Sequence, residues 1–365
     1  MISFKFDNIE LTGLACCVPD NCETLDKYVD VFGREAVDNF MYKTGVQQRY
    51  IAKGGQTSSD LAYVAATKLL DEKQINRADV GVLVFVTQTP DYRLPATSYV
   101  LQDRLGLSED CMCFDVNHGC SGYTYGLGIL SSMLKSSDAK YGLLLTGDVI
   151  SQYMAPEDKS VCMLMADGGS ATLLQKKDNA AYINIGYESD GSSFKAVMIP
   201  SGASRNTNGD TKRTLWSCDG NVRSDYDLVM NGLEVFSYAL LNVPRFVKKY
   251  LDAVDRTPND YDAFVMHQAN LYLMRQLAEK IGFQIEKTLV SVDRYGNTSV
   301  NSIPISIVDT FSSPPPVCKL ASRLLLCSFG GGMSLGLVDI DMSNTVIIPM
   351  IYSNEIYDGG GLSHD

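Results

Sequence analysis

Short runs of consecutive apolar residues alternate with longer amphipathic stretches along most of the chain. In the N-terminal half we expect the apolar runs to be buried strands, because they are short, apolar throughout and bounded by turn residues. The predicted strands are Gly81–Gln88, Met112–Val116, Gly142–Thr146 and a hairpin-like pair, Val161–Met165 and Ala171–Leu174. A helix from Ser59 to Glu72 is expected before the first of these strands, and another helix after Cys120.

The C-terminal half repeats this order of elements, which predicts a second set of strands and helices. The predicted strands are Asp262–Met266, Thr288–Val292, Leu324–Ser328 and Ser334–Ile340, and the predicted helices span residues 269–281 and 299–311. When the two halves are laid over each other, the turn at Cys120 coincides with the turn at Asn297. The strand that ends at Gln88 coincides with the strand that ends at His267.

We therefore predict an α/β fold of two pseudo-symmetric βαβαβ halves with parallel sheets. The halves are residues 1–175 and 176–342, and residues 343–365 form a C-terminal tail. Residues 186–228 are polar and rich in Gly, Ser and Asn, and do not take part in the repeat. Ser312–Pro316 is expected to be a surface connector.

The overall charge and the cysteine usage narrow the class of protein. With 31 Lys and Arg against 43 Asp and Glu, the net charge of -12 argues against a nucleic-acid-binding surface. The N-terminus lacks the apolar core of a signal peptide, and no apolar run is long enough to span a membrane. The ten cysteines include no CxxC pair and there are three histidines, so structural zinc is not expected. We predict a cytoplasmic protein with reduced cysteines and no metal.

One cysteine, Cys120, stands at a predicted strand-to-helix turn. The free N–H groups and the positive end of the helix are expected to favour the thiolate form of its side chain. His267 and Asn297 also lie just past predicted strands, and α/β sheets bind their ligands at the carboxyl ends of strands. A cysteine nucleophile, a histidine and an asparagine that meet in one cleft indicate covalent acyl chemistry.

Five short motifs follow one another in a characteristic order. They are Phe-Asp-Val-Asn-His-Gly-Cys-Ser-Gly (114–122), Ala-Asp-Gly-Gly-Ser (166–170), His-Gln-Ala-Asn (267–270), Gly-Asn-Thr-Ser (296–299) and Phe-Gly-Gly-Gly (329–332). Over residues 8–342 the chain resembles the thiolase-fold condensing enzymes, specifically the β-ketoacyl-[acyl carrier protein] synthase III branch. The resemblance implies a thiolase-like fold whose two halves form an α-β-α-β-α layered arrangement.

The resemblance also implies a decarboxylative condensation. Cys120 attacks an acyl thioester to give an acyl-enzyme, and the backbone N–H groups of Cys120 and Gly331 stabilise the oxyanion. His267 and Asn297 then hold the enolate oxygen that forms when a malonyl thioester, carried by acyl carrier protein, loses CO2. The carbanion attacks the acyl group, and the product is a β-ketoacyl thioester.

Several substrate contacts are implied in the same way. Phe329 flanks the cleft, and Leu94 crosses a homodimer interface into the acyl pocket of the partner. Asn270, Lys43 and Lys159 are the other residues expected to bind substrate. The expected substrates are thioesters of coenzyme A or of acyl carrier protein, and no further cofactor is expected.

Two departures from the family concern the acyl donor. The family often holds the adenine of coenzyme A between a tryptophan and an arginine, and these positions correspond to Asn39 and Lys159, whereas the only tryptophan is Trp216. Tyr272 stands where an arginine contacts the carrier protein. The remaining candidates for a basic carrier patch, which could equally be a solvated helix face, are Arg275, Lys280, Lys248 and Lys249.

Two other functions stay open at this point. An acyltransferase of the same fold would pass the acyl group from Cys120 to a hydroxyl or an amine, with His267 as general base. A non-catalytic partner subunit would keep the fold without turnover. His118, two residues before Cys120, is expected to have a structural role rather than to act as a base.

Overall fold

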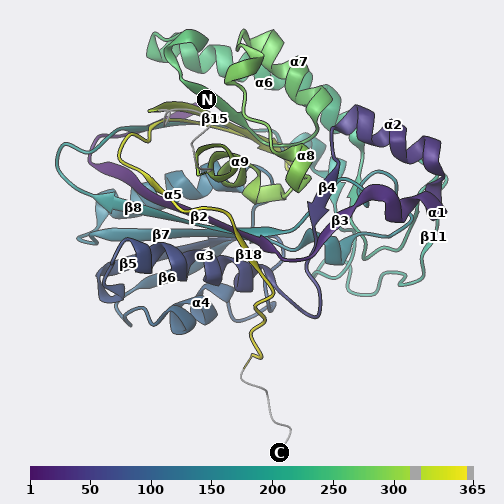
Figure 1. The fold of residues 1–365 in the computed structure, drawn as a ribbon, viewed down its shortest axis with the longest axis horizontal. Helices are drawn as coiled ribbons and strands as arrows, with labels where there is room; N and C mark the ends of the chain where they lie inside the picture. Colours follow the sequence, from purple (N-terminus) through teal and green to yellow (C-terminus); the bar gives the residue numbers. More distant parts are fainter. Residues whose placement is uncertain (313–321, 360–365) are drawn as a thin grey trace, which may run out of the picture.

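The computed structural model describes residues 1–312 and 322–359. Two β-sheets are stacked with helices on their outer faces and between them, which confirms the α-β-α-β-α layering (Figure 1). One outer layer consists of α3 (Ser58–Glu72) and α4 (Thr97–Leu105), the middle layer of α5 (Gly122–Ser136) and α9 (Ser302–Phe311), and the other outer layer of α6 (Gly232–Val254) and α7 (Leu271–Ile281). Side chains of the inner sheet faces pack against α5 and α9 in a continuous apolar core.

The first sheet is built mainly from the N-terminal half. Its strand order is β17 (Val346–Ile347), β2 (Ile9–Pro19), β8 (Gly168–Lys176), β7 (Tyr141–Asp148), β5 (Val80–Val86) and β6 (Met112–Val116), and β18 (Ile351–Ser353) also pairs with β2. The neighbours β7, β5 and β6 run parallel, whereas β8 is antiparallel to both β7 and β2. The parallel strands therefore bring their carboxyl ends to one edge.

The second sheet has the order β1 (Ile2–Phe6), β9 (Ile183–Ser189), β16 (Ser334–Asp341), β15 (Arg323–Gly330) and β14 (Ala263–Met266). Here β14 and β15 are parallel and the other pairs are antiparallel. The prediction of parallel sheets is thus correct only for the strands that lead to the predicted site. The sheets also cross the expected half boundaries, because β1 joins the second sheet and the tail strands β17 and β18 join the first.

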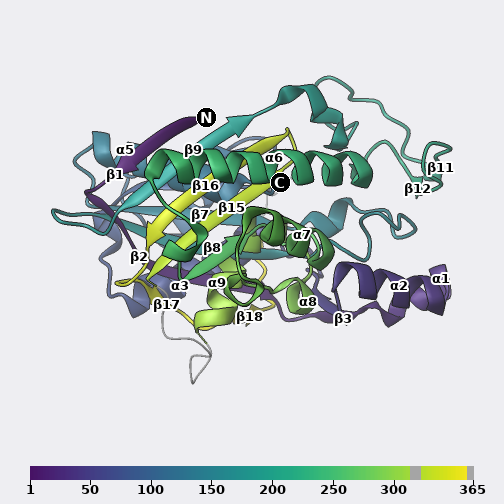
Figure 2. The ribbon, with the colours of Figure 1, turned by 90° about the horizontal axis from the view of Figure 1, so that it is seen from above.

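Several smaller elements lie to one side of the two sheets (Figure 2): β3 (Cys22–Thr24), α1 (Val29–Phe32), α2 (Arg34–Thr44), β11 (Thr214–Leu215) and β12 (Val222–Arg223). The other short elements are β4 (Gln48–Tyr50), α8 (Val292–Tyr295) and the strands β10 (Val197–Met198) and β13 (Val229–Met230). The strands β10, β11, β12 and β13 fall at residues 197–230. Most of the predicted connector Ser312–Pro316 lies outside the described residues.

Two predicted strands are not strands. Val161–Met165 forms a buried turn, and the Arg49 guanidinium donates to the carbonyl oxygens of Cys162 and Met165. In Thr288–Val292 a single bridge joins Thr288 to β14, and α8 starts at Val292. There the Gln268 side chain takes the place of a neighbouring strand: its Oε1 accepts from the N–H of Ser291, and its Nε2 donates to the carbonyl of Leu289.

Candidate active site

Cys120 lies in the loop that joins β6 to α5, immediately before Ser121, the N-cap residue of α5. Two glycines make room for this position. A Cβ atom on Gly330 would stand 2.4 Å from Cβ of Cys120, and a Cβ atom on Gly119 would stand 2.1 Å from Oε1 of Gln88. The approach at Gly330 is too close for any side chain, so the end of β15 reaches Cys120 because this residue is a glycine, whereas a side chain at Gly119 would only require the Gln88 side chain to move. The Cys120 residue is half-buried.

The surroundings of Cys120 favour the neutral thiol. Burial raises the pKa of the thiol to about 11, and the negative charge of Asp148 acts in the same direction. Hydrogen bonds from the Ser299 hydroxyl and from the backbone N–H groups of Cys120 and Gly331 lower the pKa but do not outweigh burial. The expectation that the helix terminus makes Cys120 a thiolate is therefore wrong for the free site. The two predicted oxyanion donors both lie close enough to the sulfur to lower the thiol pKa.

Asp148 and Ser299 are neighbours of the cysteine that the sequence analysis did not select. Asp148 ends β7 and is fully buried, and its Oδ1 accepts from the backbone N–H of Gln88 at 2.8 Å. Burial raises the pKa of its carboxyl to about 6, against the effect of several hydrogen bonds, the Ser299 hydroxyl among them. Asp148 lies two residues past the predicted strand Gly142–Thr146, and His267 lies just past the predicted strand Asp262–Met266, so the same positional rule could have found Asp148. Ser299 has a φ of 51°, a left-handed conformation that the sequence around this serine does not predict.

His267 follows β14, and its backbone N–H donates to the carbonyl of Cys327 on β15 at 2.9 Å. The imidazole is buried and lies edge-on to Phe329, with ring centroids 5.4 Å apart. Burial lowers the pKa of His267 to about 3, so the ring is neutral. Its Nδ1 has no hydrogen-bond partner in the part of the chain that the structure describes. A neutral ring of this kind can offer one N–H to a ligand oxygen.

Asn297 is fixed by both its backbone and its side chain. The backbone N–H donates to Leu164 and the carbonyl accepts from Ala166, each at 2.9 Å. The side-chain Oδ1 accepts from the backbone N–H of Ser299 at 3.0 Å. This bond orients the amide, so that Nδ2 is the atom left to donate to a ligand. Ser299 thus contacts both Asn297 and Cys120. Phe329 contacts His267, and the next residue, Gly330, lies against Cys120, so His267 belongs to the same site.

The predicted substrate contacts are spread more widely. Phe329 is buried on β15 beside His267. Asn270 is the N-cap of α7, where its Oδ1 accepts from the N–H of Leu273 at 2.8 Å, so its carbonyl oxygen already has a structural partner. Leu94 is 82% exposed in the loop before α4, which suits a residue that packs against another chain rather than its own core. These substrate roles stay predictions.

The positions expected to bind coenzyme A are exposed. Lys43 lies in the last turn of α2, and Nζ of Lys159 stands 5.2 Å from the ring centroid of Phe32. Phe32 is an aromatic residue beside Lys159 that the sequence analysis missed, because it does not align with the family tryptophan. Trp216 instead packs on Arg223, with its Nε1 donating to the carbonyl of that residue at 3.1 Å.

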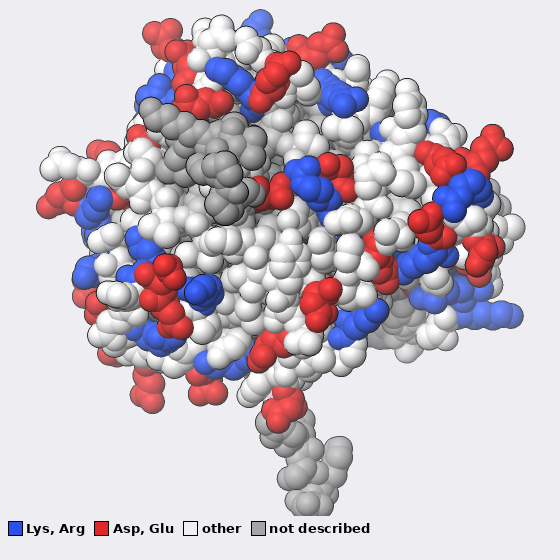
Figure 3. Space-filling model, viewed as in Figure 1, with Lys and Arg blue, Asp and Glu red and all other residues white. Residues whose placement is uncertain are grey.

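Acidic and basic side chains are interspersed over the face shown in Figure 3. Among the candidates for a carrier patch, Lys249 is paired with Glu188 at 2.9 Å, and Lys248, Arg275 and Lys280 are exposed. Tyr272, which replaces the family arginine, stacks on Phe236 with ring centroids 6.0 Å apart. This part of α6 and α7 is therefore aromatic as well as basic.

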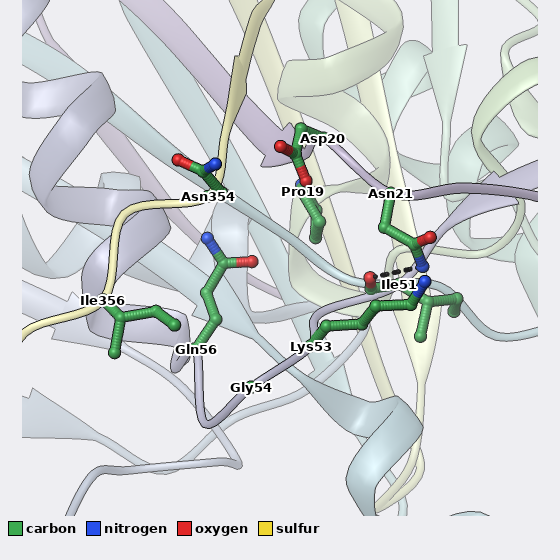
Figure 4. Close-up of a pocket in the computed structure, with 9 residues that line it drawn as sticks. All are labelled: Pro19, Asp20, Asn21, Ile51, Lys53, Gly54, Gln56, Asn354 and Ile356. Atoms are coloured by element: carbon green, nitrogen blue, oxygen red, sulfur yellow. Dashed lines mark hydrogen bonds between the residues drawn. The ribbon is translucent and has the colours of Figure 1, made fainter.

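A hollow lies between the tail and the loops that follow β2 and β4 (Figure 4). Asn21, Lys53 and Gln56 line it from the body, and Ile356 lines it from the tail. Nε2 of Gln56 donates to the carbonyls of Ser353 and Glu355, both at 3.0 Å, and so holds the tail in place. The hollow contains none of the predicted site residues.

Within residues 1–312 and 322–359, no group of three or more His, Cys, Asp or Glu side chains is placed to hold a metal ion. Over the same ranges, the helices are all too short or too polar to cross a membrane.

Comparison with known proteins identifies the family. The model described as 3-oxoacyl-[acyl-carrier-protein (ACP)] synthase III matches residues 114–191, and the model of its C-terminal part matches residues 251–341. The β-ketoacyl-[acyl-carrier-protein] synthase III of Xylella fastidiosa is 33% identical over 294 residues, which are 80% of this chain and 86% of that protein. That of Natranaerobius thermophilus is 31% identical over 337 residues, which are 90% and 98% of the two chains.

Solved structures agree with this result. A 3-oxoacyl-(acyl-carrier protein) synthase from Burkholderia xenovorans superposes with a TM-score of 0.89 at 32% sequence identity, over 96% of this chain and 99% of that chain. The layered architecture described above is therefore the thiolase-like fold implied by the sequence motifs. The chain belongs to the β-ketoacyl-[acyl-carrier-protein] synthase III family.

Proposed function

We propose that this protein condenses an acyl thioester with malonyl-[acyl carrier protein] to a β-ketoacyl thioester. The observation that carries the proposal is that the predicted catalytic groups lie in one site. The backbone N–H groups of Cys120 and Gly331 act on the Cys120 sulfur. Ser299 links this sulfur to Asn297, and Phe329 contacts His267. No observation favours the alternative acyltransferase or a non-catalytic subunit.

The first half-reaction is transfer of the acyl group to Cys120. The thiol gives up its proton as the sulfur attacks the thioester carbonyl, and the carbonyl oxygen becomes negative. The N–H groups that bond the sulfur in the free site, from Cys120 and Gly331, are placed to receive this oxyanion. Collapse of the intermediate releases the thiol of the carrier and leaves an acyl thioester on Cys120.

The second half-reaction uses His267 and Asn297. The neutral imidazole offers one N–H and the oriented amide offers Nδ2, and two such donors stabilise an enolate without a proton transfer. Loss of CO2 from the malonyl group then generates a carbanion that attacks the acyl carbonyl on Cys120. The new carbon–carbon bond replaces the carbon–sulfur bond, and the Cys120 sulfur leaves as a thiolate that takes up a proton again. The burial that keeps His267 neutral suits it to donate a hydrogen bond and not to act as an acid.

The family name supports acyl carrier protein as a partner of this chain, with coenzyme A thioesters as the other candidate donors and no further cofactor. A homodimer is supported by β6, which forms an edge of the first sheet, and by the exposed Leu94 and Met112 near this edge. The cytoplasmic location stays a prediction.

Intact-mass spectrometry with a panel of acyl-coenzyme A and acyl-carrier thioesters tests this function. We expect an acyl adduct that is lost in Cys120→Ala, and that malonyl carrier protein discharges with release of CO2. An adduct that resists the malonyl carrier and leaves with an alcohol or an amine would instead show an acyltransferase. No adduct with any donor would show that the chain is not catalytic.

A further inference from the structure

A chain of three hydrogen bonds runs behind the nucleophile from His118 to the glycine turn. Nδ1 of His118 lies 3.3 Å from Oγ of Ser121, and this hydroxyl lies 2.5 Å from Oγ of Ser334. Ser334 in turn donates to the carbonyl oxygen of Gly331 at 3.1 Å. The chain therefore connects His118 and Ser121, which lie on either side of Cys120 in the sequence, to the glycine whose N–H lowers the pKa of the Cys120 thiol.

The number of protons fixes the direction of this chain. A carbonyl oxygen only accepts, so the Ser334 hydroxyl donates its one proton to the carbonyl oxygen of Gly331. In the contact between the two hydroxyls, the donor must then be Ser121. Since Ser121 has no second proton, the third proton has to come from Nδ1–H of His118. The chain is complete only when the imidazole carries its proton on Nδ1.

The His118 ring is held in the orientation that the chain needs. It packs on Tyr125 with ring centroids 4.4 Å apart, and Tyr125 packs on Tyr187 at 4.3 Å. The hydroxyl of Tyr125 lies 3.1 Å from Oγ of Ser189, which anchors the stack. Burial lowers the pKa of His118, so its ring is neutral and one tautomer must be selected.

The glycine turn is where such an anchor has an effect. Gly331 lies between two other glycines, and a run without Cβ atoms has wide conformational freedom. Its N–H and its C=O share one Cα atom. A hydrogen bond that holds the C=O therefore restricts the direction of the N–H, which the proposed function makes an oxyanion donor.

We propose that His118 is a positioning residue, which as the Nδ1–H tautomer fixes the oxyanion-hole donor Gly331 through Ser121 and Ser334. The inference rests on the proposed function for the meaning of the Gly331 N–H. The hydrogen-bond chain itself can be tested independently of any reaction.

The first test is the 15N–1H correlation spectrum of the full-length protein labelled on its histidine rings. With three histidines in the chain, the His118 signals can be assigned by their loss in His118→Asn. We expect His118 to carry its proton on Nδ1. Observation of the Nε2–H tautomer would overturn the proposal, even if the enzyme proves fully active.

The second test compares two substitutions of His118. His118→Phe keeps a ring against Tyr125 but removes the donor, whereas His118→Asn places an amide Nδ2 near the position of Nδ1. We expect His118→Phe to slow single-turnover acylation of Cys120 about 10- to 100-fold, less than the 10²–10³ loss of a whole oxyanion donor. His118→Asn should restore the rate to within about threefold of the wild type. An Asn variant as slow as the Phe variant would show a purely structural role.

Coupling along the chain is the third readout. Ser121→Ala breaks the same chain one bond further on, so we expect it to slow acylation to a similar extent. The double variant of His118→Phe and Ser121→Ala should be no slower than either single variant, because residues of one hydrogen-bond network are not additive. Fully additive losses would contradict the proposed chain. If no thioester acylates the wild-type protein, the proposed function is refuted. The tautomer measurement would still test the hydrogen-bond chain from His118 to Gly331.

Discussion

At the scale of single residues, the site combines a nucleophilic sulfur with a buried carboxylate. The charge of Asp148 opposes ionisation of Cys120, while the Ser299 hydroxyl and two backbone N–H groups favour it. The thiol of the free site is therefore neutral, and a neutral thiol is less prone to oxidation or non-specific alkylation than a thiolate. Attack on a thioester requires that the proton leaves as the bond forms.

We expect Asp148→Asn to make Cys120 more reactive towards an alkylating agent. Removal of the negative charge lowers the thiol pKa, and a decrease of about one unit raises the thiolate fraction at pH 8 about tenfold. The amide Oδ1 can still accept from the N–H of Gln88. The measurement is the rate of iodoacetamide modification of Cys120 as a function of pH.

Asp167→Asn is the matched control for this experiment. Asp167 is also fully buried, burial also raises the pKa of its carboxyl to about 6, and it accepts from the N–H of Ala52 at 2.8 Å. Asp167 is not among the largest causes of the pKa shift of Cys120. If both substitutions accelerate alkylation equally, the effect comes from general loosening and not from the Asp148 charge.

A second prediction concerns the pH dependence of decarboxylation. Because burial lowers the pKa of His267 to about 3, its ring stays neutral from pH 8 down to about pH 4. The rate of malonyl decarboxylation on the acylated enzyme should therefore not fall through an ionisation of His267 between pH 8 and pH 5. The measurement is single-turnover release of CO2 across this range. A loss with an apparent pKa near 6.5 that disappears in His267→Gln would contradict a neutral donor.

At the scale of elements, short apolar runs predicted β5, β7 and β15, which lie between two other strands and are buried on both faces. Such runs also predicted the edge strands β6 and β14, whereas β2, which lies between two strands and is buried throughout, is not among the predicted strands. Val161–Met165 has the same apolar character but is a turn, since Arg49 satisfies its carbonyls in place of a neighbouring strand. Arg49 is distant from Val161–Met165 in the sequence, so the local apolar pattern does not indicate this contact.

The same limit applies to the site. Cys120 and His267 could be found because each follows a strand, and strand ends are visible in the sequence. Asn297 follows the short helix α8 and not the strand predicted before it, so its position came from its motif. The hydrogen bonds of Ser299 and the chain from His118 to Gly331 depend on how α5, α9 and the β15–β16 turn pack together. Such contacts between elements follow from the three-dimensional arrangement and not from spacing along the chain.

Arg49 provides a prediction at this scale. Its side chain is 1% exposed, and its guanidinium also contacts the Tyr28 hydroxyl and lies 3.6 Å from Glu23. Arg49→Met leaves the buried carbonyl of Met165 and the Tyr28 hydroxyl without their donor, while the carbonyl of Cys162 still accepts from Tyr28 at 2.8 Å. We expect the free energy of unfolding to fall by about 3 kcal/mol or more. The measurement is urea denaturation. Arg34→Met, which removes exposed ion pairs with Asp26 and Asp38, serves as the control and should leave the urea unfolding curve nearly unchanged. Equal losses would contradict the assigned role of Arg49.

At the scale of the whole molecule, one edge of the first sheet is covered by the tail strands and the other edge is not. The tail strands β17 and β18 pair with β2 and cover one edge. Beyond them the tail is held by Arg104, whose guanidinium lies between the rings of Tyr63 and Tyr357 at 4.3 and 4.4 Å. The tail therefore closes an edge that would otherwise invite pairing with another chain. β6 forms the opposite edge of the described sheet order, and an apolar side chain, Met112, is exposed there.

This difference leads to a prediction for assembly. If the protein forms the proposed homodimer across β6, a charge at Met112, which is 55% exposed, has to be buried without a partner in the interface. We expect Met112→Lys to shift the protein from dimer to monomer in sedimentation-velocity experiments at micromolar concentration. Ile2→Lys is the matched control, because Ile2 is 60% exposed on β1 at the edge of the second sheet and should tolerate a charge. A Met112→Lys variant that stays dimeric would place the interface elsewhere. Dissociation by this substitution, with acyl-chain selectivity altered as well, would support the role of Leu94 in the pocket of the partner.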